Sequence, residues 1–257
     1  MAAIHSEWIG GDHNYDLSGR GYPNYRRADP RIAALIHSAL GDAKTVLNIG
    51  AGSGNYEPED RYVIAIEPSV VMRAQRPKHL VPAIHGAAES LPLDDASVDA
   101  SMAILTIHQW GDLERGLREL RRVTRGPIVI MTFDPSALNR LWLSHYIPEF
   151  HLIEGKRFRP IDEICGLLAE NTSVSTIPIP LDCVDGFTEA YYGRPEAFLD
   201  PAVRKSQSAW SFMDPPIVRN GIDLLFKDIE SGHWDRMFGH LRTQPFFEGA
   251  LRLIIRH

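Results

Sequence analysis

The chain has 257 residues, of which 44% are hydrophobic, and 33 acidic against 27 basic side chains give a net charge of −6. This length is enough for one α/β domain with a sizeable insertion, or for one domain plus a small second one. No apolar run approaches the roughly 20 residues that span a bilayer, and the acidic balance lacks the basicity of nucleic-acid-binding proteins, so we expect neither a membrane nor a nucleic-acid partner.

The first 28 residues are rich in Gly, Tyr, Asn and Arg and show no clear period, so we expect a loop or lid over 1–28. The N-terminus lacks a basic region followed by a long apolar core, the pattern of a secretory signal, and we expect a cytoplasmic protein. The pair Asp29-Pro30 then predicts the start of a helix, with Asp as the cap and Pro in the first turn, and Gly41 predicts its end.

A glycine-rich turn between two apolar runs is the most informative stretch of the chain. A short apolar run over 46–49 leads into Gly50, Gly52 and Gly54, and the second apolar run ends at Glu67. Glycines let the backbone turn sharply and approach a ligand closely. A carboxylate at the tip of the next strand can accept both hydroxyls of a ribose. The pattern predicts a nucleoside site at the carboxyl edge of a doubly wound sheet.

The residues that follow argue against a dinucleotide. The dinucleotide fingerprint has a third glycine where this chain has Asn55, and Glu57, Glu59 and Asp60 would repel phosphates. A ribose without a phosphate, next to a sulfonium cation, fits these acids better. At this point the chain resembles the class I S-adenosylmethionine-dependent methyltransferases, whose glycine motif is similar to the sequence at 48–54, Asn-Ile-Gly-Ala-Gly-Ser-Gly.

The resemblance implies a Rossmann-like α/β fold with a seven-stranded, mostly parallel sheet whose last strand is antiparallel. One departure is the crossover between Gly54 and Tyr62, which leaves room for barely one helical turn where a parallel connection usually takes a dozen residues. A second departure is Ala87, which stands where many relatives carry an acid beside the adenine.

In chain order, we expect strands over 46–49, 62–67, 80–85, 98–105, 128–133, 174–179 and 251–255, and further helices over 69–75, after Asp112 and over 162–170.

An insertion separates the last two expected strands. Residues 181–246 lie where this family normally has a simple hairpin, and Asp200-Pro201 and Asp214-Pro215 predict two helix starts within them. We interpret this segment, together with 139–158, as a helical cap of the kind found in small-molecule methyltransferases of bacterial secondary metabolism. The expected organisation is a lid over 1–28, a cofactor-binding core over 29–180, a helical cap over 181–246 and the final core strand over 247–257.

His108 is the best candidate for a catalytic residue. It comes just after the fourth expected strand, where residues of this family commonly face the substrate, and the ordinary histidine pKa of about 6.5 suits proton removal near neutrality. It could instead pack against the cofactor or cap the following helix. Methyl transfer mainly requires that the acceptor be held in line with the methyl group, so a base is needed only if the acceptor must lose a proton.

The N-terminal segment around Tyr22 and Arg26 resembles the tyrosine-bearing lid of the ubiquinone-biosynthesis-type (type 11) methyltransferases, which closes over the methionine end of S-adenosylmethionine. The resemblance therefore implies S-adenosylmethionine as the cofactor. Two cysteines, Cys165 and Cys183, are too few for a metal cluster, and we expect no metal. The residues expected at the cofactor are Tyr22, Arg26, Gly50, Ala51, Gly52, Gly54, Glu67, Pro68, Ser69, Ala88, Glu89 and Leu105.

The expected function is methylation of a small-molecule metabolite at oxygen, nitrogen or carbon, as in secondary or antibiotic metabolism. Two alternatives stay open on the sequence. The same cofactor site could serve a reaction without methyl transfer, or the fold could act as a non-catalytic binding or regulatory protein. The oligomeric state is not encoded in any pattern of the chain.

Overall fold

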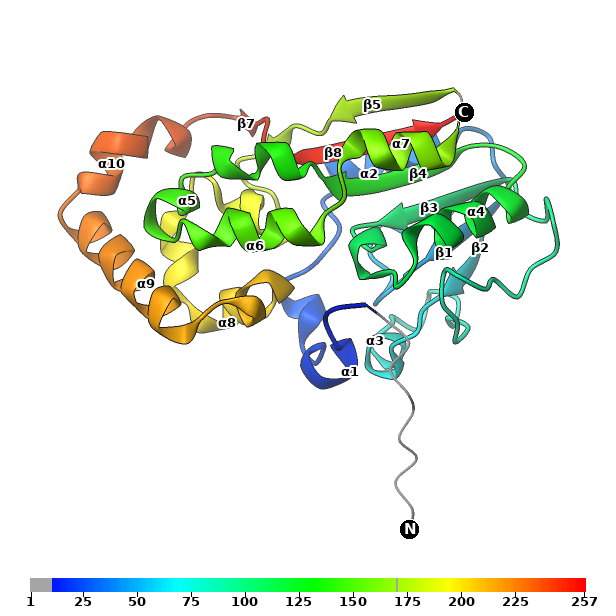
Figure 1. Ribbon diagram of the computed structural model, residues 1–257, viewed down its shortest axis with the longest axis horizontal. Helices are drawn as coiled ribbons and strands as arrows, with labels where there is room; N and C mark the ends of the chain where they lie inside the picture. Colours follow the sequence, from blue (N-terminus) through cyan, green and yellow to red (C-terminus); the bar gives the residue numbers. More distant parts are fainter. Residues whose placement is uncertain (1–10, 170) are drawn as a thin grey trace, which may run out of the picture.

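The computed structural model describes residues 11–169 and 171–257, so the first ten residues of the expected lid lie outside the described part. A six-stranded sheet in the order β2-β1-β3-β4-β8-β5 forms its centre (Figure 1). Neighbours among β2, β1, β3 and β4 run parallel, whereas β8 is antiparallel to both β4 and β5. This confirms the α/β class and the antiparallel final strand. The strands are β1 (Thr45–Ile49), β2 (Tyr62–Ile66), β3 (Ala100–Ile104), β4 (Ile128–Phe133), β5 (Thr172–Thr176) and β8 (Leu251–Arg256).

The expectation of seven strands in this sheet was wrong. The segment over 80–85 makes only one isolated bridge, in which Ile84 pairs with Ile66. Val81 and Ile84 are 36% and 48% exposed. A strand at this edge would have its outer side in water, with little apolar surface to bury, so the local apolar pattern does not produce a paired strand here.

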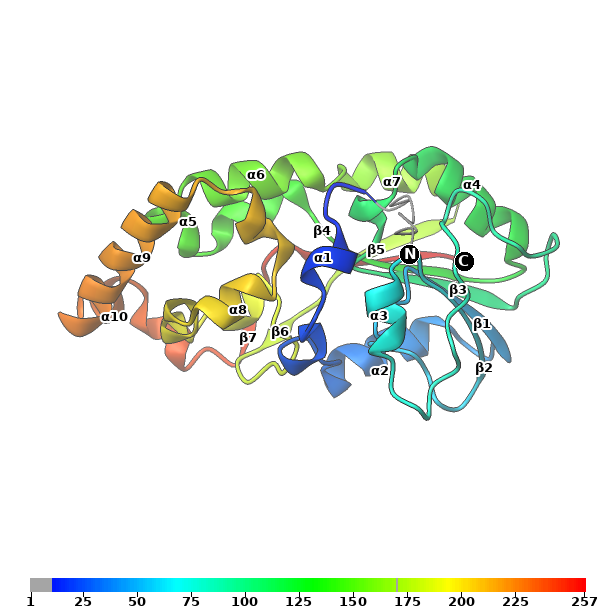
Figure 2. The ribbon, with the colours of Figure 1, turned by 90° about the horizontal axis from the view of Figure 1, so that it is seen from below.

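Helices cover both faces of the sheet (Figure 2). On one face lies α2 (Pro30–Ala39), which Asp29 caps by accepting a hydrogen bond from the Arg31 amide, as expected. On the other face lie α4 (Leu113–Val123), capped by Asp112, and α7 (Ile161–Leu168). Leu117 and Leu120 of α4 are fully buried against the sheet. The helix expected over 162–170 is α7, which begins one residue earlier and ends two residues earlier than expected.

The short crossover after β1 was predicted correctly. The segment over 50–61 contains no helix. Glu57, which sits in it, is buried and pairs with Arg76 at 2.7 Å while accepting a hydrogen bond from the Asn48 side chain at 2.9 Å. The charge of Glu57 is therefore matched by that of Arg76. Contrary to the expectation, this carboxylate is not free to repel a ligand.

A helical lobe extends beyond the carboxyl end of β4 (Figure 1, left). Its aromatic core centres on Trp142, whose ring lies 5.7 Å from that of Phe198 and 5.5 Å from that of Trp234. Two short strands, β6 (Ile179–Pro180) and β7 (Phe246–Phe247), pair at the point where residues 181–246 leave and rejoin the core. The lobe consists of η3 (Pro135–Arg140), α5 (Leu143–Tyr146), α6 (Glu149–Arg157), η4 (Thr188–Tyr191), η5 (Pro195–Leu199), α8 (Pro201–Lys205), η6 (Ser208–Phe212), α9 (Pro215–Glu230), α10 (His233–Phe238) and η7 (Gly239–Arg242).

The N-terminal segment lies between the sheet and this lobe (Figure 2). It forms α1 (Tyr15–Ser18) and η1 (Tyr22–Asn24), and α1 packs against α3 (Val70–Ala74). Asp16 of α1 accepts a hydrogen bond at 2.6 Å from Ser69, the cap of α3. The described N-terminal residues are thus attached to the start of α3.

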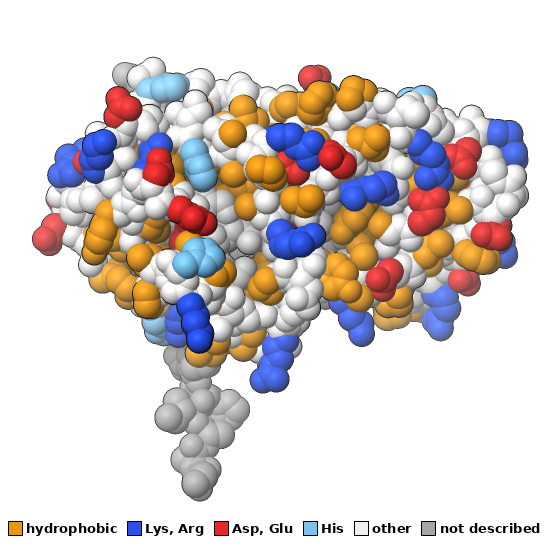
Figure 3. Space-filling model, turned by 180° about the vertical axis from the view of Figure 1, so that it is seen from behind, with side chains coloured by type: hydrophobic (Ala, Val, Ile, Leu, Met, Phe, Trp, Pro, Cys, Tyr) orange, Lys and Arg blue, Asp and Glu red, His pale blue; other side chains and the backbone are white. Residues whose placement is uncertain are grey.

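Charges of both signs are interspersed on the face of the molecule shown in Figure 3. Each helix in the described part of the chain is too short or too polar to pass through a membrane.

Candidate active site

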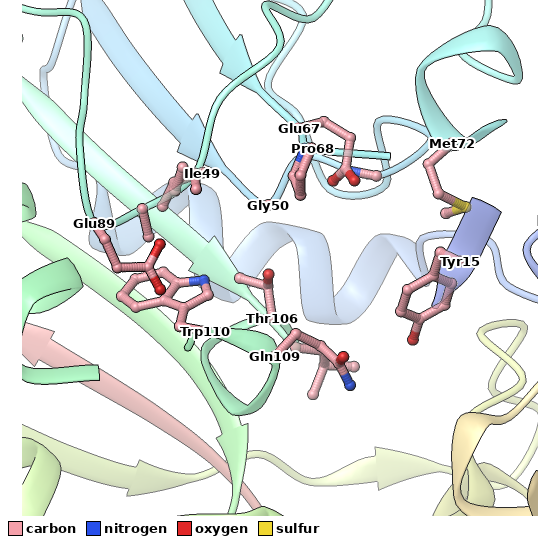
Figure 4. A pocket seen from close by; sticks show the side chains of 14 residues that line it. Tyr15, Ile49, Gly50, Glu67, Pro68, Met72, Glu89, Thr106, Gln109 and Trp110 are labelled. Atoms are coloured by element: carbon pink, nitrogen blue, oxygen red, sulfur yellow. The ribbon is translucent and has the colours of Figure 1, made fainter. Parts of the chain in front are cut away.

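A pocket opens at the carboxyl ends of β1, β2 and β3, and we call it the glycine-loop pocket (Figure 4). Gly50 is required at its base because its φ is +64° and a Cβ there would collide with the Thr106 side chain. The pocket is lined by Tyr15, Ile49, Gly50, Gly52, Glu67, Pro68, Met72, Ala87, Ala88, Glu89, Leu105, Thr106, Gln109 and Trp110.

Glu67 follows β2 and is only 6% exposed. Its two carboxylate oxygens accept hydrogen bonds from the Gly52 and Ser69 amides, both at 2.8 Å. Burial raises the pKa of Glu67, while these two amide bonds act in the opposite direction. The carboxylate is therefore fixed between the glycine loop and the start of α3, with its side chain lining the pocket (Figure 4).

Glu89 and Trp110 form another side of this pocket (Figure 4). Glu89 accepts a hydrogen bond from the Asp112 amide at 3.1 Å, and Ala88 is buried. Ala87 also lines the pocket, so the position that lacks the usual acid is where the resemblance placed it. A flat aromatic ring facing a slot of this kind suits the planar base of a nucleoside.

The expected cofactor residues divide into two groups. Gly50, Gly52, Glu67, Pro68, Ala88, Glu89 and Leu105 line the glycine-loop pocket. Five others do not line it: Ala51, Gly54, Ser69, Tyr22 and Arg26. Ser69 instead caps α3, and Ala51 and Ser69 are buried behind the loop.

A second, smaller cavity of about 50 Å³ adjoins the first, and we call it the inner pocket. Tyr15 and Leu105 line both cavities. The walls come from β3, β4, the N-terminal segment and the helical lobe. The inner pocket is lined by Tyr15, Arg26, Leu105, His108, Phe133, Glu154, Arg157, Phe158, Phe187, Thr188, Gln207, Ser208 and Ala209.

His108 lies in η2 (Ile107–Gln109), just past β3, with its ring 4.6 Å from that of Phe158. Its Nδ1 is buried and has no hydrogen-bond partner in the described part of the chain. Burial, reinforced by the nearby charge of Arg157, lowers the pKa of His108 to about 3. The imidazole is therefore neutral at pH 7 and can accept a hydrogen bond from a molecule in the inner pocket, but its pKa lies well below the range that suits proton removal near neutrality.

Glu154 and Arg157, whose side chains are largely buried, form one wall of the inner pocket and belong to a charge cluster that the sequence did not reveal. Arg157 pairs with Glu154 at 2.6 Å and with Asp12 at 2.7 Å, and it donates to the Ser208 hydroxyl at 3.0 Å. Burial raises the pKa of Glu154, and Arg157 opposes that effect. Glu154 and Arg157 are three residues apart on α6, a common surface pairing that gives no sign of burial in the sequence. Their place at the pocket follows only from the tertiary fold.

Comparison with known proteins shows the family of the chain. A model of the methyltransferase domain family matches residues 47–127. A solved structure from Anabaena variabilis, described as a methyltransferase from an antibiotic biosynthesis pathway, is 35% identical, with a TM-score of 0.84 over 91% of this chain and 99% of that one. The chain belongs to the class I S-adenosylmethionine-dependent methyltransferases.

Curated relatives match less than half of this methyltransferase. An uncharacterized methyltransferase of Mycobacterium tuberculosis is 36% identical over 114 residues, which is 41% of this chain and 44% of the relative. A malonyl-[acyl-carrier protein] O-methyltransferase of Pectobacterium atrosepticum is 35% identical over 127 residues, 45% of this chain and 48% of the relative. The chain spans less than half the length of these curated relatives.

Arg26 of the methyltransferase lines the inner pocket and not the glycine-loop pocket, although its carbonyl accepts a hydrogen bond at 3.1 Å from the side chain of Asn55, directly after Gly54. Its Nε is 2.5 Å from Asp185 of the insertion, and its guanidinium lies 5.2 Å from the ring of Tyr22. Burial on its own would lower the pKa of Arg26, but Asp185 more than compensates and raises it. The cation is thus permanently charged and already paired.

The described part of the methyltransferase contains no group of three or more His, Cys, Asp or Glu side chains that could hold a metal ion.

Proposed function

We propose that this enzyme transfers the methyl group of S-adenosylmethionine to a small-molecule acceptor whose reacting atom enters the inner pocket. The observation that carries the proposal is the contact between the two cavities, because Tyr15 and Leu105 line both. A cofactor in the first cavity would present its methyl group toward the second. The name of the Anabaena relative, from an antibiotic pathway, supports a small metabolite as the acceptor.

The residues of the glycine-loop pocket fit S-adenosylmethionine. Gly50 and Gly52 leave room for a ligand close to the backbone, and Glu67 lines the same pocket with a carboxylate that could accept hydrogen bonds from ribose hydroxyls. Ala88, Glu89 and Trp110 would border the adenine, and Tyr15 and Met72 would border the methionine end. When bound, the cofactor supplies a methyl group on a positively charged sulfur, which is already activated for transfer.

The chain's own task is then to position the acceptor and exclude water. Phe133, Phe158 and Phe187 give the inner pocket apolar walls. Neutral His108, whose Nδ1 lacks a partner within the described chain, would accept a hydrogen bond from an acceptor hydroxyl or amine and so orient the reacting atom, while its low pKa makes it a poor base for taking the acceptor's proton.

We also propose that the N-terminal segment acts as a lid and that residues 181–246 act as a cap over the inner pocket. Arg26 and Asp185 support this, because their ion pair joins the two segments at the wall of that pocket. Release of the acceptor product would then require at least one of the two segments to move.

The experiment uses S-adenosylmethionine carrying a radioactive methyl group and a panel of small aromatic and aliphatic alcohols, amines and carboxylic acids. We expect label in an acceptor together with an equal amount of S-adenosylhomocysteine. Conversion of an acceptor without S-adenosylhomocysteine would contradict methyl transfer and favour the non-methylating alternative. Calorimetry with S-adenosylhomocysteine alone tests the cofactor site, and a lack of binding at millimolar concentration would overturn the proposal.

A further inference from the structure

The helical lobe carries a third cavity, of about 670 Å³, which we call the outer groove. It lies between the α8–η6 segment and α9, and residues of the N-terminal segment close one side of it (Figure 1). A volume of this size matches that of pockets which hold molecules of several hundred daltons. The groove is far larger than the inner pocket, so it can take the bulk of a ligand that the inner pocket cannot hold.

The floor of the groove is apolar. Trp210 and Met213 are 8% and 6% exposed, and Val218 and Ile222 of α9 are half-buried beside them. Trp210 is held in place from below, where its ring lies 5.4 Å from that of Phe150. An apolar body lying on this floor would remove both its own surface and that of the groove from water.

The rim of the groove is cationic. Arg204, Lys205 and Arg219 line it, and Asp223 is its one carboxylate. Lys205 and Arg219 make no ion pair within the described residues, so both charges remain available. This local positive excess stands against a net charge of −6 for the whole chain. Such a rim attracts an anionic group and repels a cationic one.

The groove and the inner pocket are one side chain apart, because Gln207 lines both. Gln207 is 6% exposed and accepts hydrogen bonds from the Thr188 hydroxyl at 2.6 Å and from the Trp210 indole at 3.2 Å. A molecule that lies in the groove therefore has its inner end beside the cavity that contains His108.

We propose that the outer groove binds the methyl acceptor, and that the acceptor is an amphipathic small molecule with a carboxylate or phosphate group. The anionic group would pair with Lys205 and Arg219, the apolar body would lie on Trp210 and Met213, and the reacting atom would reach the inner pocket at Gln207. This inference rests on the proposed function, and it adds the chemical class of the acceptor.

The test compares two probes that differ by one anionic group. 1-Anilinonaphthalene-8-sulfonate has an aromatic body with a sulfonate, and N-phenyl-1-naphthylamine has the same kind of body without the charge. Both are titrated by fluorescence into the enzyme saturated with S-adenosylhomocysteine, so that the glycine-loop pocket is filled. We expect the wild-type enzyme to bind the sulfonate about tenfold more tightly than the neutral probe, since two exposed charge contacts each contribute modestly.

Three double variants decide the outcome. In Lys205→Gln/Arg219→Gln the preference for the sulfonate should fall to about twofold or less. In Arg115→Gln/Lys227→Gln, which removes two exposed cations outside the groove, and in Lys205→Arg/Arg219→Lys, which keeps both charges, the preference should persist. Equal binding of the two probes by the wild type, or a preference that survives in Lys205→Gln/Arg219→Gln, would overturn the proposal.

Binding of S-adenosylhomocysteine, measured on each variant by calorimetry, separates this inference from the proposed function. Unchanged binding in all variants shows that each is folded with an intact cofactor site. Failure of the wild type to bind S-adenosylhomocysteine would contradict the proposed function, whereas normal binding with no sulfonate preference would contradict the groove alone.

Discussion

Arg26 and Asp185 form a buried ion pair although 159 positions separate them in the chain. The two side chains are 10% and 0% exposed, and the Tyr56 hydroxyl donates a further hydrogen bond to Asp185 at 2.9 Å. The pair therefore connects the N-terminal segment, the insertion and the loop that follows the glycine turn. Three parts of the chain that are distant in sequence meet at one carboxylate.

Asp185→Asn should destabilise the fold strongly. It keeps the shape of the side chain but leaves the Arg26 cation buried without a counter-ion, which typically costs about 3–5 kcal/mol. Urea denaturation measures the free energy of unfolding. The matched control is Asp182→Asn, because Asp182 is 81% exposed in its ion pair with Arg31, and its loss should stay below about 1 kcal/mol. Equal, small losses of unfolding free energy in both variants would show that the buried pair contributes little to stability.

Glu67→Gln should weaken binding of S-adenosylhomocysteine by about 1.5–3 kcal/mol, the range for hydrogen bonds to a charged group. The glutamine side chain would also place its NH₂ group against the backbone N–H of either Gly52 or Ser69, since both of these donate to the carboxylate. Calorimetry measures the affinity. Glu59→Gln, at a side chain that is 76% exposed on the same crossover, should leave it unchanged. Unaltered affinity of Glu67→Gln would remove Glu67 from the cofactor site.

Gly50→Ala should abolish cofactor binding and destabilise the fold. The new Cβ would collide with Thr106, and a φ of +64° costs an alanine about 1–2 kcal/mol. Gly155→Ala provides the contrast, because a Cβ at this position on α6 would point into open space, and the variant should gain about 0.5–1 kcal/mol from helix propensity. Thermal melting and calorimetry test both. A Gly50→Ala protein that binds S-adenosylhomocysteine normally would contradict the close approach at the loop.

The His108 ring should stay neutral from pH 8 down to about pH 4, because burial lowers its pKa to about 3. Its Cε1 proton, identified by the signal missing in His108→Asn, should show no NMR titration near pH 6.5. Between about pH 6.5, the ordinary pKa of His108 in the unfolded chain, and its lowered pKa in the folded protein, the unfolded chain binds more protons than the folded one. Acidification below about pH 6.5 should therefore lower the free energy of unfolding of the wild type by up to about 1.4 kcal/mol per pH unit. In His108→Asn this contribution to the pH dependence of the unfolding free energy should be absent. A titration of His108 near pH 6.5 would show that the ring is solvated.

Glu189 should produce the opposite pH dependence. It is 2% exposed, and burial raises its pKa to about 7, although its bonds with the Ala250 amide, at 2.8 and 3.0 Å, favour the charged form. The folded state then binds more protons than the unfolded state between about pH 4.5 and 7, so this group's contribution to stability falls as pH rises through that window. Glu189→Gln should remove the effect in urea denaturation. Identical pH profiles for the two proteins would mean that the carboxylate is already ionised at pH 5.

Local chemistry explains which parts of the fold could be predicted. The helices α2, α8 and α9 all begin at the proline of an Asp-Pro pair, as expected, and the aspartate caps α2 and α8 through its side chain. The glycine turn and Glu67 were recognised together because both lie at the ends of neighbouring strands. Each of these patterns carries its physical cause within a few residues.

The errors and omissions have a tertiary cause. The run over 80–85 has the composition of a strand, but a strand also needs a neighbour and a buried face, and Val81 and Ile84 are exposed. The charge cluster around Arg157 unites Asp12 with Glu154 across most of the chain, and no periodicity marks it. The cofactor roles of Tyr22 and Arg26 stay predictions, and the pairing of Arg26 with Asp185 at the inner pocket is revealed only by the folded chain.

The short pairing of β6 with β7 has a consequence for how such enzymes diversify. Ile179 lies opposite Phe247 and Pro180 opposite Phe246, so residues 181–246 depart from and return to the sheet at a single junction. A segment joined in this way can be exchanged without altering the order of the strands, provided that its contacts with the rest of the chain are kept, chiefly the Asp185–Arg26 ion pair and the bonds from the Ala250 amide to Glu189. Grafts between relatives that keep these contacts offer a route to new acceptor preferences.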